Sequence, residues 1–144
     1  MLAELAFIDY LWKQSYPAME AVISTSGDQL VRKETPWGEY YASVFKQVAG
    51  KQISQTDFND EIMNKYGTAL GELHSLSRKF ENPIAKRWTH TDIFEWIEMT
   101  LDELRMDQQP LKELAFLKNQ FAQLHVNREN YGLIHFDFEP DNVF

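Results

Sequence analysis

The sequence contains no cysteine, and only six of its 144 residues are glycine and five are proline. The absence of cysteine excludes a disulfide scaffold, a thiolate zinc site and a cysteine nucleophile. It is typical of a reducing compartment, so we expect the cytoplasm. The scarcity of glycine and proline, with 44% hydrophobic residues, excludes collagen-like, low-complexity and disordered chains. These features predict a globular domain with a sizeable core.

Basic residues and long apolar runs are also scarce. The 14 Lys and Arg residues are outnumbered by 22 Asp and Glu residues, which gives a net charge of -8. This charge opposes nonspecific binding to nucleic acid and to anionic bilayers, so we expect neither partner. No apolar run reaches the roughly 18 residues of a membrane-spanning helix. Residues 1–14 carry Glu4 and Asp9 and lack a basic leader, so we expect no signal peptide.

The first 50 residues predict one helix followed by short strands. Apolar residues from Leu2 to Trp12 recur with a helical period, and Pro17 follows the polar stretch that ends the helix. Aromatic, β-branched and turn-forming residues then predict three strands, the first two as a hairpin. The expected strands cover 20–25, 29–33 and 40–48, with turns at 26–28 and 35–38.

After Gly50 the pattern becomes helical, and we place a lobe boundary at 48–55. The first helix is expected to be capped by Thr56 or Asp57 and to bury one apolar stripe. This stripe consists of Ile62, Tyr66, Ala69, Leu70, Leu73 and Leu76. A loop at Asn82-Pro83 precedes two further helices. Their inward-facing residues are Ile93, Ile97, Leu101 and Leu104, and then, after Pro110, Leu111, Leu114, Leu117, Phe121 and Leu124.

The last ten residues carry the candidate chemistry. A short apolar strand over 131–134 leads into His135, Asp137 and Asn142, with the spacing HxDxxxxN. An Asp at the start of such a loop can accept a proton from a substrate hydroxyl. An Asn five positions later can bind Mg²⁺ that bridges nucleotide phosphates. The spacing indicates phosphoryl transfer, and the alternative is a polar surface loop with a capping Asp.

These motifs resemble the aminoglycoside phosphotransferase family, the small-molecule branch of the protein-kinase-like fold. YGLIHFDFEPDNVF at 131–144 is similar to the family's catalytic loop, and GTALGELHSL at 67–76 is similar to its LGxLHxLS helix. The stretch at 40–50 resembles the strand and hinge that join the two lobes, and the three pieces occur in the family's order.

The resemblance implies an α+β, protein-kinase-like fold. A partial N-terminal lobe, made of a helix and a short antiparallel sheet of three strands, would cover 1–47. A hinge would cover 48–55, and the helical first half of the C-terminal lobe would cover 56–144. The implied activity is that of a small-molecule kinase that uses ATP and Mg²⁺ to phosphorylate an alcohol acceptor.

The resemblance also implies roles for single residues. Asp137 would be the catalytic base, Asn142 a metal ligand and His135 the residue that braces the loop through its imidazole. Phe136 stands where the family commonly has Gly, and this bulk changes the expected shape of the acceptor pocket. The backbone of the hinge would hold the adenine at Gln47, Val48 and Ala49.

Glu4 is the remaining residue to which the resemblance gives a role. It falls in the apolar sector of the first helix, and an inward-facing carboxylate needs a partner. In the kinase-like fold that partner is a strand lysine that contacts the phosphates. The alternative for Glu4 is a solvated residue near a frayed terminus.

Two parts of the implied machinery are missing from the sequence: a glycine-rich loop with a lysine-bearing strand before Met1, and a second metal-binding Asp after Asn142. We therefore expect this chain to be the middle of a longer protein and to have little or no activity alone. The alternative functions are a noncatalytic kinase-like binding protein and a plain helical interaction module. Exposed apolar helix faces would predict a homodimer.

The acidic excess bears on the expected acceptor. In the family, negatively charged pockets suit cationic substrates such as aminoglycosides or choline. Six carboxylates occur in the region of the two later helices, at Asp92, Glu95, Glu98, Asp102, Glu103 and Asp107.

Overall fold

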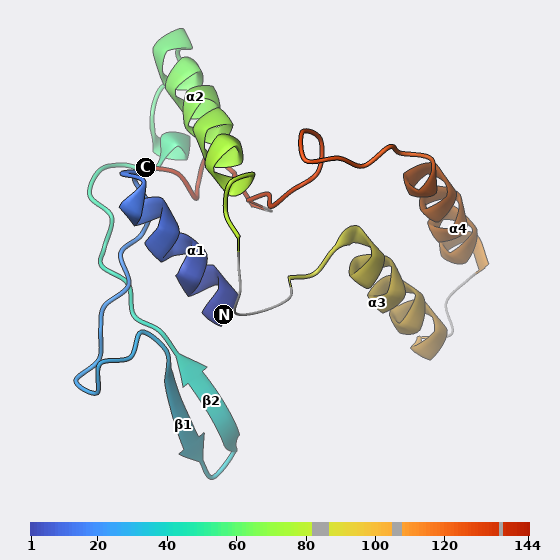
Figure 1. The fold of residues 1–144 in the computed structure, drawn as a ribbon, viewed down its shortest axis with the longest axis horizontal. Coiled ribbons are helices and arrows are strands. Elements are labelled where there is room, and N and C mark those ends of the chain that lie inside the picture. The colour runs from blue at the N-terminus through green and yellow to red at the C-terminus, as the bar shows by residue number, and fades with distance from the viewer. Residues whose placement is uncertain (82–86, 105–107, 136) are drawn as a thin grey trace. The chain divides into compact units, whose positions relative to one another are not determined.

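The computed structural model describes residues 1–81, 87–104, 108–135 and 137–144. In these residues the fold is α+β, with four α-helices, one short 3-10 helix and a two-stranded antiparallel sheet (Figure 1). The chain divides into two compact units, one formed by Met1–Ala85 with Gly132–Phe144 and the other by Lys86–Tyr131. The predicted lobe boundary at 48–55 falls inside the first unit and stays a prediction.

The first helix confirms the sequence-based prediction. Helix α1 covers Leu2–Lys13 and buries Ala3, Leu5 and Leu11. Its Tyr10 hydroxyl donates to the Leu76 carbonyl oxygen over 3.2 Å, and the rings of Tyr10 and Phe80 lie 5.0 Å apart. These contacts pack α1 against the C-terminal end of the helix that ends at Ser77, so the periodic apolar face is the one that forms the core.

The predicted hairpin over 20–25 and 29–33 is wrong. Strands β1 (Val31–Thr35) and β2 (Gly38–Ala42) pair with each other instead, across the turn that follows Thr35. The Thr35 hydroxyl donates to the Gly38 carbonyl oxygen and accepts from the Trp37 N–H, which stabilises this turn. Gly38 has a φ of 129°, a conformation that favours glycine.

The turn at 26–28 does form, but it closes a compact loop rather than a hairpin. The Ser24 N–H donates to the Asp28 carbonyl oxygen over 2.9 Å, and Gly27 has a φ of 91°. The predicted first strand is reduced to one β-bridge between Ala21 and Phe45. The described part of the N-terminal region therefore contains two strands and this bridge, not the three strands that we expected.

A short 3-10 helix, Ile53–Gln55, precedes helix α2 (Asp60–Ser77). The predicted apolar stripe of α2 is confirmed, because every member is at least partly buried and Leu73 is only 3% exposed. The predicted caps are wrong. Asn59 caps α2 by accepting from the Ile62 N–H, whereas the Thr56 hydroxyl already donates to the Ile53 carbonyl oxygen over 2.7 Å.

The second unit contains helices α3 (His90–Glu103) and α4 (Gln108–Ala122). Their facing rings are in contact, since Phe94 and Phe121 lie 5.1 Å apart edge to face, and Leu114 of α4 is buried. Four residues expected to face inward are instead substantially exposed: Leu104, Leu117, Phe121 and Leu124. Leu104 and Leu124 lie beyond the ends of the two helices, and two helices alone cannot cover a full apolar stripe on each other. The loop predicted at Asn82-Pro83 lies outside the described residues.

No helix among the described residues combines the length and the apolar character needed to cross a membrane.

Candidate functional site

The candidate site lies in the C-terminal segment of the first unit. The strand predicted over 131–134 is absent, and this described stretch is irregular. A strand needs a neighbour that completes its backbone hydrogen bonds, and the sheet in the described residues consists of β1 and β2 alone. The loop is therefore positioned by its contacts rather than by a preceding strand.

The loop brings Asp137 and Asn142 together, and we call these residues the Asp–Asn pair. Asn142 Nδ2 donates to Asp137 Oδ2 over 2.9 Å and to the Asp137 carbonyl oxygen over 3.3 Å. The Asn142 N–H donates to the Glu139 carbonyl oxygen over 2.9 Å, which closes the turn between them. Both side chains are exposed, so an approaching ligand can reach them. The spacing in the sequence thus produces a direct contact between the two predicted site residues.

The oxygens of the Asp–Asn pair are suitable ligands for Mg²⁺. Because Asn142 Nδ2 points to Asp137, the amide oxygen of Asn142 stays an acceptor. Mg²⁺ is usually held by one or two carboxylates together with substrate phosphates, and an amide oxygen is also an oxygen ligand for such hard cations. In the described ranges, no three His, Asp or Glu side chains gather closely enough to hold a metal ion by themselves. The residues present therefore fit a site that the phosphates of a nucleotide complete.

His135 contacts the loop through a ring, in a different way from the two residues of the pair. Its imidazole lies 5.4 Å from the ring of Phe138, edge to face at 81°. Phe138 in turn stacks on Tyr66 of α2, with ring centroids 5.0 Å apart and an angle of 27°. The Tyr66 hydroxyl donates to the Phe138 carbonyl oxygen. The predicted bracing role of His135 stays a prediction.

A second support for the loop comes from the segment just before α2. The Ile53 N–H donates to the Val143 carbonyl oxygen over 2.8 Å, and the Ser54 N–H donates to the Pro140 carbonyl oxygen over 2.9 Å. The Gln52 side-chain amide donates to the Asp141 carbonyl oxygen. The C-terminal end of the chain accordingly lies beside the 3-10 helix (Figure 1).

Sequence reasoning missed both supports of the loop. Tyr66 was predicted only as a member of an apolar stripe, although a hydroxyl on such a stripe signals a hydrogen-bond partner. Nothing in the sequence distinguishes Gln52 from other polar residues of the predicted hinge.

The predicted adenine site lies in an exposed, irregular stretch. Gln47, Val48 and Ala49 belong to no helix or strand, and all three are exposed. They follow the bridge at Phe45 and precede Gly50, whose φ of 117° lets the chain turn toward Gln52. The stretch leads directly into the segment that is bonded to the loop, and its role in binding adenine stays a prediction.

The expectation that Glu4 faces inward is wrong. The Glu4 side chain is 59% exposed and forms an ion pair with the amino group of Met1. The reason is its position along α1, because it lies in the first turn, where the positive end of the helix attracts a carboxylate. The implied contact of Glu4 with a lysine stays a prediction.

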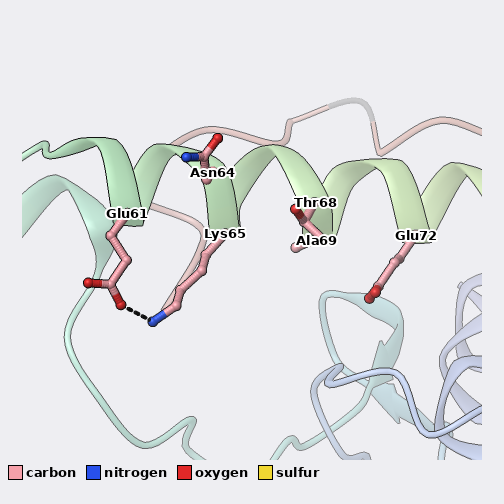
Figure 2. A pocket seen from close by; sticks show the side chains of 6 residues that line it. All are labelled: Glu61, Asn64, Lys65, Thr68, Ala69 and Glu72. Carbon is pink, nitrogen blue, oxygen red and sulfur yellow. Dashed lines mark hydrogen bonds and ion pairs between the residues drawn. The ribbon is translucent and has the colours of Figure 1, made fainter.

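A hollow of about 350 Å³ lies along one face of α2. Figure 2 shows its lining, which comes from this one helix: Glu61, Asn64, Lys65, Thr68, Ala69 and Glu72. Lys65 pairs with Glu61 over 2.6 Å, and this hydrogen bond and charge lower the pKa of Glu61. None of the predicted site residues lines the hollow, so we assign no role in catalysis to it.

Two of the six carboxylates noted above have structural partners. Asp92 forms a capping box with Thr89 at the start of α3, and Glu98 pairs with Lys118 of α4 over 2.6 Å. Asp107, like Phe136, lies outside the described residues. The acidic composition of this region therefore reflects helix capping and helix pairing in part.

Comparisons with known proteins place the chain in a family. A family model described as "Phosphotransferase enzyme family" matches residues 1–144. The amicoumacin kinase of Bacillus subtilis (strain 168) is 29% identical over 112 residues, which cover 73% of this chain and 32% of that protein. The chain thus spans about a third of the length of the curated relative that it matches. These matches confirm the resemblance to aminoglycoside phosphotransferases. The chain belongs to the phosphotransferase enzyme family, and its α+β fold is consistent with part of a kinase-like fold.

Proposed function

We propose that the protein containing this chain transfers the γ-phosphate of ATP to a hydroxyl group of a small molecule. The observation that carries this proposal is the hydrogen bond of 2.9 Å from Asn142 Nδ2 to Asp137 Oδ2, which joins the residue proposed as metal ligand to the residue proposed as base. Family membership supports the reaction class. The relative named as an amicoumacin kinase supports a small-molecule acceptor.

Asp137 acts as the base in the proposed reaction. The acceptor oxygen forms a bond to the γ-phosphorus while the bond from that phosphorus to the bridging oxygen of ADP breaks, and the hydroxyl proton moves to the Asp137 carboxylate. Asn142 donates to Oδ2 of this carboxylate and so fixes its orientation, which leaves Oδ1 to accept the proton. His135 contributes through its edge-to-face contact with the Phe138 ring.

Asn142 would hold Mg²⁺ through its amide oxygen, together with phosphate oxygens of the nucleotide. The bound ion would supply positive charge that neutralises the phosphates and the leaving group. The protein's own contribution is to keep the amide oriented, because Nδ2 is fixed by two bonds to Asp137.

The nucleotide end of the proposed site lies on the exposed stretch from Gln47 to Ala49. Its backbone is available to the adenine ring, and its continuation at Ile53 is hydrogen-bonded to Val143 of the loop. Glu4 would pair with a lysine near the phosphates. The use of ATP with a small-molecule acceptor and the lack of cysteine support the cytoplasm as the compartment.

The test uses the full natural polypeptide that carries these residues and measures ATP consumption with a panel of acceptors. The panel contains amicoumacin, aminoglycosides, choline, homoserine and sugars. We expect one acceptor class to stimulate turnover and Asp137→Asn to lower it by about 10²- to 10⁴-fold. Asp141→Asn is the matched control, since it removes the same charge from the same exposed loop. A polypeptide that binds Mg-ATP but phosphorylates no acceptor would instead be a noncatalytic binding protein.

A further inference from the structure

The segment between the two residues of the Asp–Asn pair is held at both ends by side chains from outside the loop. Tyr66 on α2 donates its hydroxyl proton to the carbonyl oxygen of Phe138, which directly follows the base. Gln52 donates its side-chain amide to the carbonyl oxygen of Asp141, which directly precedes the metal ligand. The two donors therefore hold the two inner neighbours of the pair.

Tyr66 is a well-fixed donor. It is partly buried in the middle of an 18-residue helix that is capped by Asn59. Its ring stacks on the ring of Phe138, so the hydroxyl and the aromatic ring of Tyr66 both contact the same residue. A site supported by a regular helix is held more accurately than one supported by a loop.

Gln52 is fixed at both atoms of its amide. Its nitrogen donates to the Asp141 carbonyl oxygen, while its oxygen accepts from the Gln55 side-chain nitrogen over 2.8 Å. The neighbouring N–H groups of Ile53 and Ser54 also donate to the loop. The segment that contains Gln52 is therefore already bonded to the loop by its backbone. The Gln52 side chain adds one more bond, next to the metal ligand.

These contacts determine the geometry of the pair because the pair itself is exposed. The two bonds from Asn142 Nδ2 to Asp137, of 2.9 Å and 3.3 Å, have water as a competitor, and each exposed hydrogen bond contributes only modestly to the geometry of the pair. A displacement of about 1 Å in a catalytic group can cost roughly 100-fold in rate. The backbone on the inner side of each residue must therefore be held by other groups.

We propose that Tyr66 and Gln52 are positioning residues that hold the carbonyl groups of Phe138 and Asp141 and so fix the separation of the Asp–Asn pair. Neither residue touches the reacting atoms, and each acts through the backbone of its neighbour in the loop. This role rests on the proposed phosphotransferase function, and it predicts a loss in the chemical step rather than in nucleotide binding.

The experiment compares Tyr66→Phe and Gln52→Ala with matched controls in the full natural polypeptide. Tyr10→Phe is the control for Tyr66, because Tyr10 also donates its hydroxyl proton to a carbonyl oxygen of a packed helix residue, over 3.2 Å. Gln29→Ala is the control for Gln52, because Gln29 donates its amide to Asp9 over 2.9 Å, outside the loop. All four variants are measured for kcat and for the KM of ATP.

We expect kcat to fall by roughly 10- to 100-fold in Tyr66→Phe and in Gln52→Ala. The KM of ATP should stay within about twofold of the wild-type value, because neither variant removes a contact to the nucleotide itself. The two control variants should match the wild type in both constants. Unchanged kcat in Tyr66→Phe and Gln52→Ala would overturn the proposal, and so would an equal loss in the controls.

A second readout separates this proposal from the proposed function. Hydrogen exchange of residues 137–144 is measured for the same variants, and it requires no turnover. Faster exchange of this segment in Tyr66→Phe and Gln52→Ala, but not in Tyr10→Phe, supports Tyr66 and Gln52 as positioning residues even if no acceptor is phosphorylated. Exchange equal to that of the wild type in all variants overturns them, whatever the activity.

Discussion

Replacement of Phe138 by Ala tests how the loop is docked on α2. Phe138 is partly buried, stacks on Tyr66 at 5.0 Å and lies edge to face with His135 at 5.4 Å. A fully buried Phe→Ala change costs about 3–5 kcal/mol, and each aromatic pair contributes about 0.5–1.5 kcal/mol beyond burial. For this partly buried ring we expect a loss of about 2–3 kcal/mol in the free energy that holds the loop closed.

Amide hydrogen exchange at Ile53 and Ser54 measures that free energy directly. Their N–H groups donate to Val143 and Pro140, so they exchange when the loop undocks. The expected loss corresponds to exchange that is roughly 30- to 150-fold faster. The Lys46 N–H, which donates to the Glu20 carbonyl oxygen outside this contact, is the internal control and should not change.

Phe138→Leu separates the contribution of the rings from that of apolar volume. Leucine keeps most of the volume and loses both ring contacts, so we expect only about 1–2 kcal/mol. If the Ile53 amide exchanges no faster in Phe138→Ala than in the wild type, the reasoning is refuted, because the loop would then be held without the Phe138 ring.

Three further predictions concern α2 and Tyr16, whose pKa is affected by Glu72 of that helix. In chemical denaturation, Leu73→Ala should lower the free energy of unfolding by about 2–5 kcal/mol, because Leu73 is only 3% exposed. Met63 lies on the exposed side of α2, so Met63→Ala should lower it by less than about 1 kcal/mol. Asn59→Ala removes the cap of α2 and should cost about 1 kcal/mol in the same measurement. Burial, and then the charge of Glu72, raise the pKa of Tyr16 above 10.0, so the stability that it contributes is present below about pH 10 and is lost at higher pH. A pH titration followed by phenolate absorbance should show a raised pKa for Tyr16, and the pKa should be raised less in Glu72→Gln.

The helices were predictable from the sequence because their signal is local. The apolar stripe of α2 and the period of α1 survive into the structure, since the residues that form each face are three or four positions apart. The caps were less predictable. Thr56 is, like Asn59, one of the residue types that cap helices, and only the tertiary structure shows that its hydroxyl is bonded to Ile53.

The strands were harder to predict because two turn signals compete. Both Gly27 and Gly38 adopt positive φ angles, so each marks a real turn. Only the second turn leaves its flanking residues in register, with Thr35 opposite Gly38 and Val31 opposite Ala42. The choice depends on pairing between strands, and the residues of one strand alone do not contain it.

The Asp–Asn pair was predictable from its motif, and its supports were not. The two residues are five positions apart in one loop, so the motif brings them within reach of each other. The bonds of Tyr66 and Gln52 join residues that are 72 and 89 positions apart. Both bonds also end on backbone carbonyl groups, which every residue has, so no residue type in the loop indicates them.

The central claim is that Asp137 takes the proton of an acceptor hydroxyl during transfer of the γ-phosphate. The most direct test is the single-turnover rate at which labelled γ-phosphate passes from ATP to the acceptor in wild type, Asp137→Asn and Asp141→Asn. We predict a fall of about 10²- to 10⁴-fold for Asp137→Asn and a nearly unchanged rate for Asp141→Asn. A rate for Asp137→Asn within about twofold of the wild type would contradict the account, because no general base would then be lost.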